Sequence, residues 1–254
     1  MGFDYEKYIR PGKLPHIWCP GCGHGIVMKG LIRAIDALSL DKNNTAIVSG
    51  IGCASRLPGY LDFCTLHTTH GRAVGFATGI KMAKPEMNVI CVGGDGDGVA
   101  IGGNHFIHAC RRNIDMTYLI MNNNIYGMTG GQFSPTTPSG AKASTTPYGN
   151  PDPPFDIAKL AIGAGATFVA RCTAFHAAQI EKLLTEAMRH KGFSVVEMMN
   201  NLKETAIPVN VAEKLAPEQL DGKVLTGVLY KDSKPEYVAE YRKMVARVQE
   251  AGAK

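Results

Sequence analysis

The stretch Gly93-Gly94-Asp95-Gly96-Asp97-Gly98 decides the fold of this chain, together with Asn122-Asn123-Asn124 further along the sequence. Short apolar segments, 88–92 and 116–121, precede the two motifs and are predicted strands, and 99–111 is a predicted helix. Adjacent parallel strands would end in these two loops side by side. Glycine amides and a helix N-terminus attract phosphate, and carboxylate and carboxamide oxygens suit Mg²⁺. The pair therefore predicts a metal-bridged diphosphate site.

Two other interpretations of the glycine run compete with this one. A Gly-rich run can be only a tight turn between a strand and a helix. It can also belong to a dinucleotide fingerprint, in which an acidic residue further along the chain binds a ribose. Asp115 has a suitable spacing but opens the next strand instead of ending it. The paired Asp and Asn loops favour the metal diphosphate, with the spacing of the thiamine-diphosphate motif.

Composition and charge exclude several classes of function. The chain has 254 residues, 45% hydrophobic content and a net charge of +5. Its basic residues are scattered without interleaved aromatics, which argues against nucleic acid as a partner. No apolar run approaches the length of about 20 residues that crosses a bilayer. Seven cysteines in a chain without an export-like N-terminus predict reduced thiols or metal ligands and a cytoplasmic location.

Strand-like and helix-like segments alternate along the first 200 residues. Residues 45–49, 88–92, 116–121, 167–170 and 193–198 are predicted strands, and 72–82, 99–111 and 155–162 are predicted helices. Continuous apolar strands separated by helices are typical of a parallel sheet covered on both faces. We therefore expect an α/β domain with such a sheet over 1–200, and a C-terminal extension over 201–254.

Two segments depart from this alternation. Residues 129–154 form a long Gly, Pro, Ser and Thr-rich loop directly after the asparagines, and we expect a functional lid. Ser233-Lys234-Pro235-Glu236 matches a capping box that would open a terminal helix. The apolar stripe of that helix contains Tyr237, Tyr241, Met244, Val245 and Val248. Docking on its own domain and contact with another subunit are both open.

Three cysteines point to a redox centre. Cys19 and Cys22 form a CxxC pair in a Gly-rich turn before a helix, which by itself fits a zinc half-site, a redox dithiol or chance. Cys53 lies at the carboxyl end of the strand 45–49, on the same sheet edge as the diphosphate loops. Thiols converging beside a redox-capable cofactor suggest an iron–sulfur cluster, which four thiolates normally hold. Cys91 and Cys110 are predicted core residues.

At this point the chain resembles a known family, the β subunits of 2-oxoacid:ferredoxin oxidoreductases. The matching motifs are WCPGCGHG (18–25), GIGCASR (50–56), THGRA (69–73), GDGD (94–97) and NNNIYGMTGGQFSPT (122–136). The resemblance implies an α/β thiamine-diphosphate-binding fold over 1–200 with an N-terminal cluster-ligand segment. It also implies Mg²⁺, one 4Fe–4S cluster, and oxidative decarboxylation of a 2-oxo acid with coenzyme A and ferredoxin. The MTGGQ sequence favours 2-oxoglutarate, with pyruvate and branched-chain acids left open.

The resemblance assigns roles to individual residues. It implies that Mg²⁺ binds the Asp95 and Asn123 side chains and the Ile125 carbonyl, and that the cluster binds Cys19, Cys22 and Cys53. The expected diphosphate contacts are Gly96, Asp97, Gly127 and Met128, and the expected thiamine contacts are Ile51, Gly52, Cys53, Ala54, His70, Gly71, Arg72 and Ala73. His70 is also a candidate catalytic residue. Arg56 is a candidate for binding the substrate carboxylate, because a guanidinium suits that group; a solvated surface arginine is the competing interpretation.

The chain has motifs for only one half of a thiamine-diphosphate site. The pyrimidine domain and the catalytic glutamate are therefore expected from an α subunit, in an αβ or (αβ)2 assembly. The family's fourth cluster cysteine is absent after 193–198, where Met199-Asn200-Asn201 continues into Leu202-Lys203-Glu204. Either a loop is missing from this junction or the cluster has three protein thiolates or none.

Two other functions compete with the oxidoreductase. A thiamine-diphosphate-dependent non-oxidative decarboxylase or synthase subunit needs no cluster, and a zinc-stabilised binding module needs no thiamine diphosphate. The three convergent cysteines favour the oxidoreductase.

Overall fold

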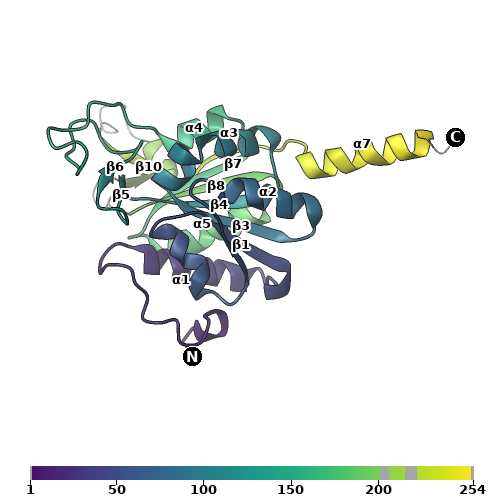
Figure 1. Cartoon of the computed structure of the whole chain (residues 1–254), viewed down its shortest axis with the longest axis horizontal. Helices are drawn as coiled ribbons and strands as arrows, with labels where there is room; N and C mark the ends of the chain where they lie inside the picture. Colours follow the sequence, from purple (N-terminus) through teal and green to yellow (C-terminus); the bar gives the residue numbers. More distant parts are fainter. Residues whose placement is uncertain (1, 201–205, 215–221, 253–254) are drawn as a thin grey trace.

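The computed structural model describes residues 2–200, 206–214 and 222–252. Its centre is a sheet in the order β2-β1-β3-β4-β8-β7-β10-β9 (Figure 1). In this sheet, the neighbouring strands β2, β1, β3, β4, β8 and β7 all run parallel. The strand β10 is antiparallel to β7, and β9 is parallel to β10. Their bounds are β1 Thr45–Ser49, β2 Cys64–His67, β3 Asn88–Gly94, β4 Met116–Asn122, β7 Phe168–Thr173, β8 Phe193–Met199, β9 Ala206–Pro208 and β10 Val224–Lys231. The predicted strands exist, and β2, β9 and β10 are strands of this sheet that the sequence pattern did not predict.

Helices cover both faces of the sheet, as predicted. One core contains α1 (His24–Ala37) and α5 (Ala177–Arg189), and the other contains α2 (Ala73–Ala83), α3 (Gly103–Arg112) and α4 (Ile157–Gly163). The strands β1 and β4 are buried along their whole length, which explains their continuous apolar sequence. α1 and α5 cross closely at Gly30, where an added Cβ would lie 2.4 Å from Ile180 Cγ2.

The predicted helix from Val99 is divided in two in the structure. A π-helix spans Gly96–Ile101, and α3 starts after Gly102. The amide of Gly102 donates to the carbonyl of Asp97 at 3.0 Å. A Cβ at Gly102 would lie 2.7 Å from that same oxygen, so only glycine fits this break.

The terminal helix α7 (Tyr237–Gly252) extends away from the body of the molecule (Figure 1). Its stripe residues Tyr237, Tyr241, Met244 and Val248 are exposed, so the structure does not dock the stripe on this domain. The predicted capping box is wrong in detail. Glu236 directly precedes the helix, and its carboxylate accepts hydrogen bonds from the amides of Val238 and Ala239, so Glu236 itself is the cap.

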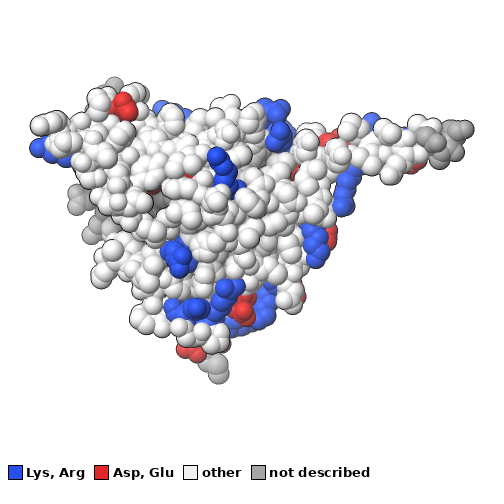
Figure 2. All heavy atoms as spheres, in the orientation of Figure 1, with Lys and Arg blue, Asp and Glu red and all other residues white. Residues whose placement is uncertain are grey.

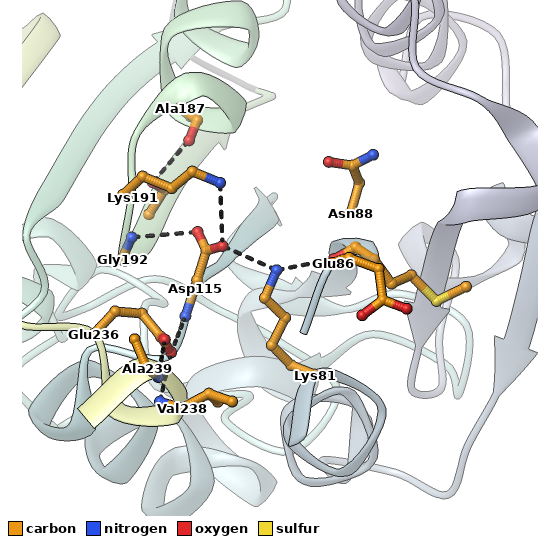
Figure 3. Close-up of polar contacts among 12 residues, drawn as sticks. Lys81, Glu86, Asn88, Asp115, Ala187, Lys191, Gly192, Glu236, Val238 and Ala239 are labelled. Atoms are coloured by element: carbon orange, nitrogen blue, oxygen red, sulfur yellow. Dashed lines mark hydrogen bonds and ion pairs between the residues drawn. The ribbon is translucent and has the colours of Figure 1, made fainter. Parts of the chain in front are cut away.

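The base of α7 is held at the amino-terminal edge of the sheet (Figure 3). The amide of Asp115, just before β4, donates to Glu236 Oε1 at 3.2 Å. The Asp115 carboxylate pairs with the buried Lys81 at 2.9 Å. Asp115 is thus structural and lies at the opposite edge from the glycine motif, in agreement with its predicted place at the start of a strand. The described residues include no helix long and apolar enough to span a membrane.

Candidate active site

A pocket lies where β1, β3 and β4 end. Because β3 and β4 pair in parallel, the glycine motif and the asparagine motif meet at this edge, as predicted. The lining includes most of the predicted cofactor residues, namely Ile51, Gly52, Cys53, Ala54, His70, Asp95, Gly96, Asp97, Asn123, Ile125, Gly127 and Met128. Ligands of parallel sheets bind beyond the carboxyl ends of the strands, and this pocket has that position.

Three predicted magnesium ligands come together in the pocket. The inward amide atom of Asn123 lies 3.1 Å from Asp95 Oδ1 and 3.0 Å from the carbonyl oxygen of Ile125. With its nitrogen turned inward, the amide donates to both oxygens. With its oxygen turned inward, the Asn123 oxygen lies at these distances from the other two oxygens, close to the separation of about 2.9 Å between neighbouring ligands in an octahedral Mg²⁺ site. The geometry of these residues therefore fits the cation.

The Asp95 carboxylate is buried and receives two hydroxyl groups from the long loop 129–154. Ser134 Oγ and Thr136 Oγ1 both donate to Asp95 Oδ2, the latter at 2.7 Å. Burial raises the pKa of Asp95, and these two hydrogen bonds oppose that rise. The sequence placed this loop near the site, but gave no signal that Ser134 and Thr136 would contact Asp95.

Behind the predicted metal ligands, polar side chains continue across the sheet. Asn122 Nδ2 donates to Glu197 Oε1 at 2.8 Å, and Arg171 Nε donates to Glu197 Oε2 at 2.8 Å. Thr136 Oγ1 lies 3.0 Å from Asn122 Oδ1, which connects this group to Asp95. Sequence reasoning missed all of these side chains. The available signal for them in the sequence was one charged residue in each of two mainly apolar strands, Arg171 in β7 and Glu197 in β8.

The Asp97 carboxylate holds two loops together. Its Oδ1 accepts from the amides of Ile51 at 3.1 Å and Gly71 at 2.7 Å, and lies 2.7 Å from His70 Nδ1. A Cβ at Gly50 would lie 2.3 Å from Oδ2, so only glycine fits beside this carboxylate. These contacts fix the position of His70 at the pocket wall. The carboxylate is therefore directed at the loops that contain Ile51 and His70, and its predicted contact with the diphosphate stays a prediction.

Other predicted residues lie outside the lining of the pocket. Gly71 and Ala73 are buried behind it, and Arg72 is exposed with its guanidinium 3.5 Å from the carbonyl oxygen of Ile101. Arg56 is exposed on the 3₁₀ segment Ala54–Tyr60. Its role in binding a carboxylate stays a prediction.

The three predicted cluster cysteines approach one another next to this pocket. Burial raises the pKa of Cys53, and the nearby Cys19 and Cys22 raise it further. Trp18 Nε1 donates to the Cys53 carbonyl at 2.7 Å, which ties the CxxC segment to the end of β1. Cys91 and Cys110 are buried in the core, as predicted. Within the described residues, no group of three or more His, Cys, Asp or Glu side chains is placed to hold a single metal ion.

His24 connects the CxxC segment to the pocket and was not predicted. It lines the pocket, burial lowers its pKa, and its Nδ1 lies 3.2 Å from Asn200 Nδ2. Asn200 directly follows β8, at the start of the junction where the family's fourth cysteine is expected. Its contact with His24 places the start of this junction beside the CxxC segment. The continuation of this junction, 201–205, lies outside the described residues.

This fold and its carboxyl-edge pocket define the class of thiamine-diphosphate enzymes. Residues 50–198 match the family described as "Thiamine pyrophosphate enzyme, C-terminal TPP binding domain". Two relatives are named 2-oxoglutarate synthase subunit KorB. The protein from Archaeoglobus fulgidus is 61% identical over 78% of this chain and 74% of its own length. The protein from Methanocaldococcus jannaschii is 47% identical over 95% of this chain and 97% of its own length.

A solved structure is similar over nearly the whole chain. It is a 2-oxoglutarate:ferredoxin oxidoreductase from Magnetococcus marinus with 2-oxoglutarate, coenzyme A and succinyl-CoA bound, and has a TM-score of 0.87 and 38% identity. The alignment covers 96% of this chain and 90% of that one. The chain belongs to the family of 2-oxoacid:ferredoxin oxidoreductase β subunits. The predicted family, fold, enzyme class and thiamine-diphosphate cofactor are confirmed.

Proposed function

We propose that this β subunit takes part in the coenzyme A-dependent oxidative decarboxylation of 2-oxoglutarate, with electrons passing singly through a 4Fe–4S cluster to ferredoxin. The names of the relatives and the ligands named for the Magnetococcus marinus structure support this substrate and coenzyme. The observation that carries the proposal is the convergence of the Asp95–Asn123–Ile125 oxygens and Cys53 on one pocket. On this proposal, the predicted metal–diphosphate ligands and a predicted cluster thiolate would share one site.

Bound thiamine diphosphate supplies an electron sink for the loss of carbon dioxide, and the protein positions and tunes it. Asp95, Asn123 and Ile125 would hold its Mg²⁺. Gly96, Gly127 and Met128 would line the diphosphate, because the glycine backbone, which carries no Cβ, permits close approach of an anion. The loops joined by Asp97 would form the thiamine wall, with His70 held there by its 2.7 Å contact.

Cys19, Cys22 and Cys53 would supply three thiolates to the cluster. Because the pKa of Cys53 is raised, cluster binding must displace its proton, and assembly is expected to improve with rising pH. A centre with three protein thiolates would be more labile than one with four.

The second half of the site would come from an α subunit that supplies a pyrimidine domain and the catalytic glutamate, in an αβ or (αβ)2 assembly. The isolated chain is then expected to be inactive. Arg56 is our candidate for the substrate carboxylate and His70 for a proton-handling role at the pocket wall.

The test is anaerobic reconstitution of the chain with its α subunit, followed by assay of 2-oxoglutarate- and coenzyme A-dependent ferredoxin reduction. Asp95→Asn should abolish Mg²⁺-dependent thiamine diphosphate binding in calorimetry, whereas Asp152→Asn, an exposed carboxylate, should leave it intact. Turnover by the isolated chain would refute the split site. Unchanged cofactor binding by Asp95→Asn would refute the metal assignment.

The absent fourth cysteine favours one second candidate, a thiamine-diphosphate-dependent non-oxidative decarboxylase or synthase subunit. Such an enzyme would keep Asp95 and Asn123 but need no thiolates. Iron and sulfide analysis of the anaerobic complex separates the two functions. About four irons per β subunit support the oxidoreductase, and none, combined with carbon dioxide release without ferredoxin reduction, supports the alternative.

A further inference from the structure

The apolar stripe of α7 has the spacing of a coiled-coil seam. Its members follow one another after four, three and four residues, which is the alternation of the a and d positions in a heptad. They are Tyr237, Tyr241, Met244 and Val248. Their exposed fractions rise along the helix from 37% and 41% to 55% and 67%. Apolar side chains at this spacing form one narrow stripe, which suits contact with a single further helix.

The helix is held at its base and is open along the rest of its length. The rings of Tyr237 and Tyr241 stack with 6.3 Å between their centroids, and the Arg112 guanidinium lies 5.9 Å from the centre of the Tyr237 ring. Together with the Glu236 contact to Asp115, these contacts fix where α7 leaves the body. Figure 2 shows α7 as a narrow projection on which uncharged atoms predominate and charged atoms of both signs are scattered. The seam is therefore presented to solvent from a fixed base.

A second copy of α7, running in the antiparallel direction, matches this seam layer by layer. A two-fold axis that crosses the seam midway between Tyr241 and Met244 brings each Tyr241 against the Met244 of the other copy. The same axis brings each Tyr237 against the Val248 of the other copy. Every layer then pairs a tyrosine with a smaller side chain, and facing helices interdigitate best when large and small side chains alternate.

The charges beside the seam favour this antiparallel direction. Glu240 and Arg247 both hold the heptad position g, and the g positions of two antiparallel helices face each other across the seam. Each Glu240 would thus face the Arg247 of the other copy, whereas in a parallel pair it would face Val245. Within one helix the two residues are about 10 Å apart along the axis, which is too far for an ion pair. Complementary charges at these positions set the partner and the orientation of paired helices.

We propose that α7 pairs with the α7 of a second copy of this chain as a two-fold antiparallel coiled coil, through the seam of Tyr237, Tyr241, Met244 and Val248. The helix leaves the molecule at the amino-terminal edge of the sheet, so the pairing leaves the pocket at the carboxyl edge open. The inference does not depend on the proposed function, because it uses no residue of the pocket. The seam is shorter than a standard interface of about 20–30 residues a side, so the dimer should dissociate on dilution.

Charge reversal tests the partner and the direction together. Glu240→Arg and Arg247→Glu each place like charges opposite one another twice in the dimer, and each should raise its dissociation constant about three- to ten-fold. The double variant Glu240→Arg/Arg247→Glu should recover the wild-type constant, since both pairs form again with exchanged sign. Arg242→Glu is the matched control, because it makes the same charge change at the outward position b of the same helix. Sedimentation equilibrium of the purified full-length chain provides the dissociation constants.

Truncation of the central layer tests the seam itself. Tyr241→Ala and Met244→Ala should each abolish the dimer in the same experiment, because they remove the side chains that meet at the two-fold axis. Alanine is the better helix former, so the helicity of the chain by circular dichroism should not fall.

Three results would overturn the inference. The first is a wild-type chain that stays monomeric at every concentration, and the second is a dimer that withstands Tyr241→Ala and Met244→Ala. The third is a dimer that both single charge reversals weaken but the double variant does not restore, because α7 would then contact a different surface. None of these results bears on ferredoxin reduction by the complex with the α subunit, so the proposed function stands or falls separately.

Discussion

Removing the Arg171 guanidinium should strongly destabilise this chain. The Arg171 side chain is 10% exposed and that of Glu197 is 1% exposed, and Nε and Oε2 lie 2.8 Å apart. Arg171→Met leaves the Glu197 carboxylate buried, with Asn122 as its remaining hydrogen-bond partner. Breaking a buried pair from one side costs about 3–5 kcal/mol. In a domain of this size that loss lowers the Tm by about 6–20 °C.

Thermal and urea denaturation followed by circular dichroism measure this loss. The double variant Arg171→Met/Glu197→Gln should recover most of the stability, because glutamine removes the unpaired charge and still accepts from Asn122. Lys243→Met is the control, since its ion pair with Glu240 is exposed and should contribute less than about 1 kcal/mol. A loss below about 1 kcal/mol for Arg171→Met would show that Glu197 is not held as a buried charge.

Three further perturbations test other parts of the structure. Burial raises the pKa of Asp156, but the Arg171 guanidinium and Lys159 together outweigh it, so the pKa is lowered overall. The stabilisation from Asp156 is therefore present above its ordinary pKa of 3.8 and lost as the pH falls through the lowered value. The free energy of unfolding of the wild type should therefore exceed that of Asp156→Asn by less as the pH is lowered. A difference that does not change with pH would contradict this assignment of the Asp156 pKa. Glu236→Ala should cost about 0.5–2 kcal/mol and reduce helicity by circular dichroism, because it removes the cap of α7. Unchanged helicity would argue against the cap. Gly30→Ala should cost about 1–3 kcal/mol in urea denaturation despite its better helix propensity, because the methyl group meets Ile180.

The fold was largely predictable because its signals are local. Buried parallel strands have continuous apolar sequences, and the glycine motif marks one strand end, so β1, β3, β4 and β8 were recognisable. The strand β10 was not predicted, since only part of it is buried and its pairing with β7 depends on distant residues. The predicted capping box does not form, because the helix begins at Tyr237 and Glu236 caps it, while the carbonyls of Lys234 and Pro235 accept hydrogen bonds from the distant Asn113.

The site was predictable to the extent that motifs carry it. The sequence proposed Asp95, Asn123 and Ile125 together, and the structure places their polar atoms about the same point. It could not supply the Ser134 and Thr136 contacts to Asp95, because a loop brings these hydroxyl groups back across the strand ends. The role of Asp97 in joining two loops likewise depends on a tertiary contact.

The sequence by itself determined the class of the protein, since glycine backbones, hard oxygen ligands and thiolates have chemistries that short motifs define. The tertiary structure decided which polar groups support that chemistry and which surfaces remain open. Buried hydrogen bonds such as Arg171–Glu197–Asn122 join residues from separate strands, and the Asp97 carboxylate joins the loops of Ile51 and Gly71. Neither leaves a local pattern in the sequence, because both depend on distances between segments that the fold alone brings together.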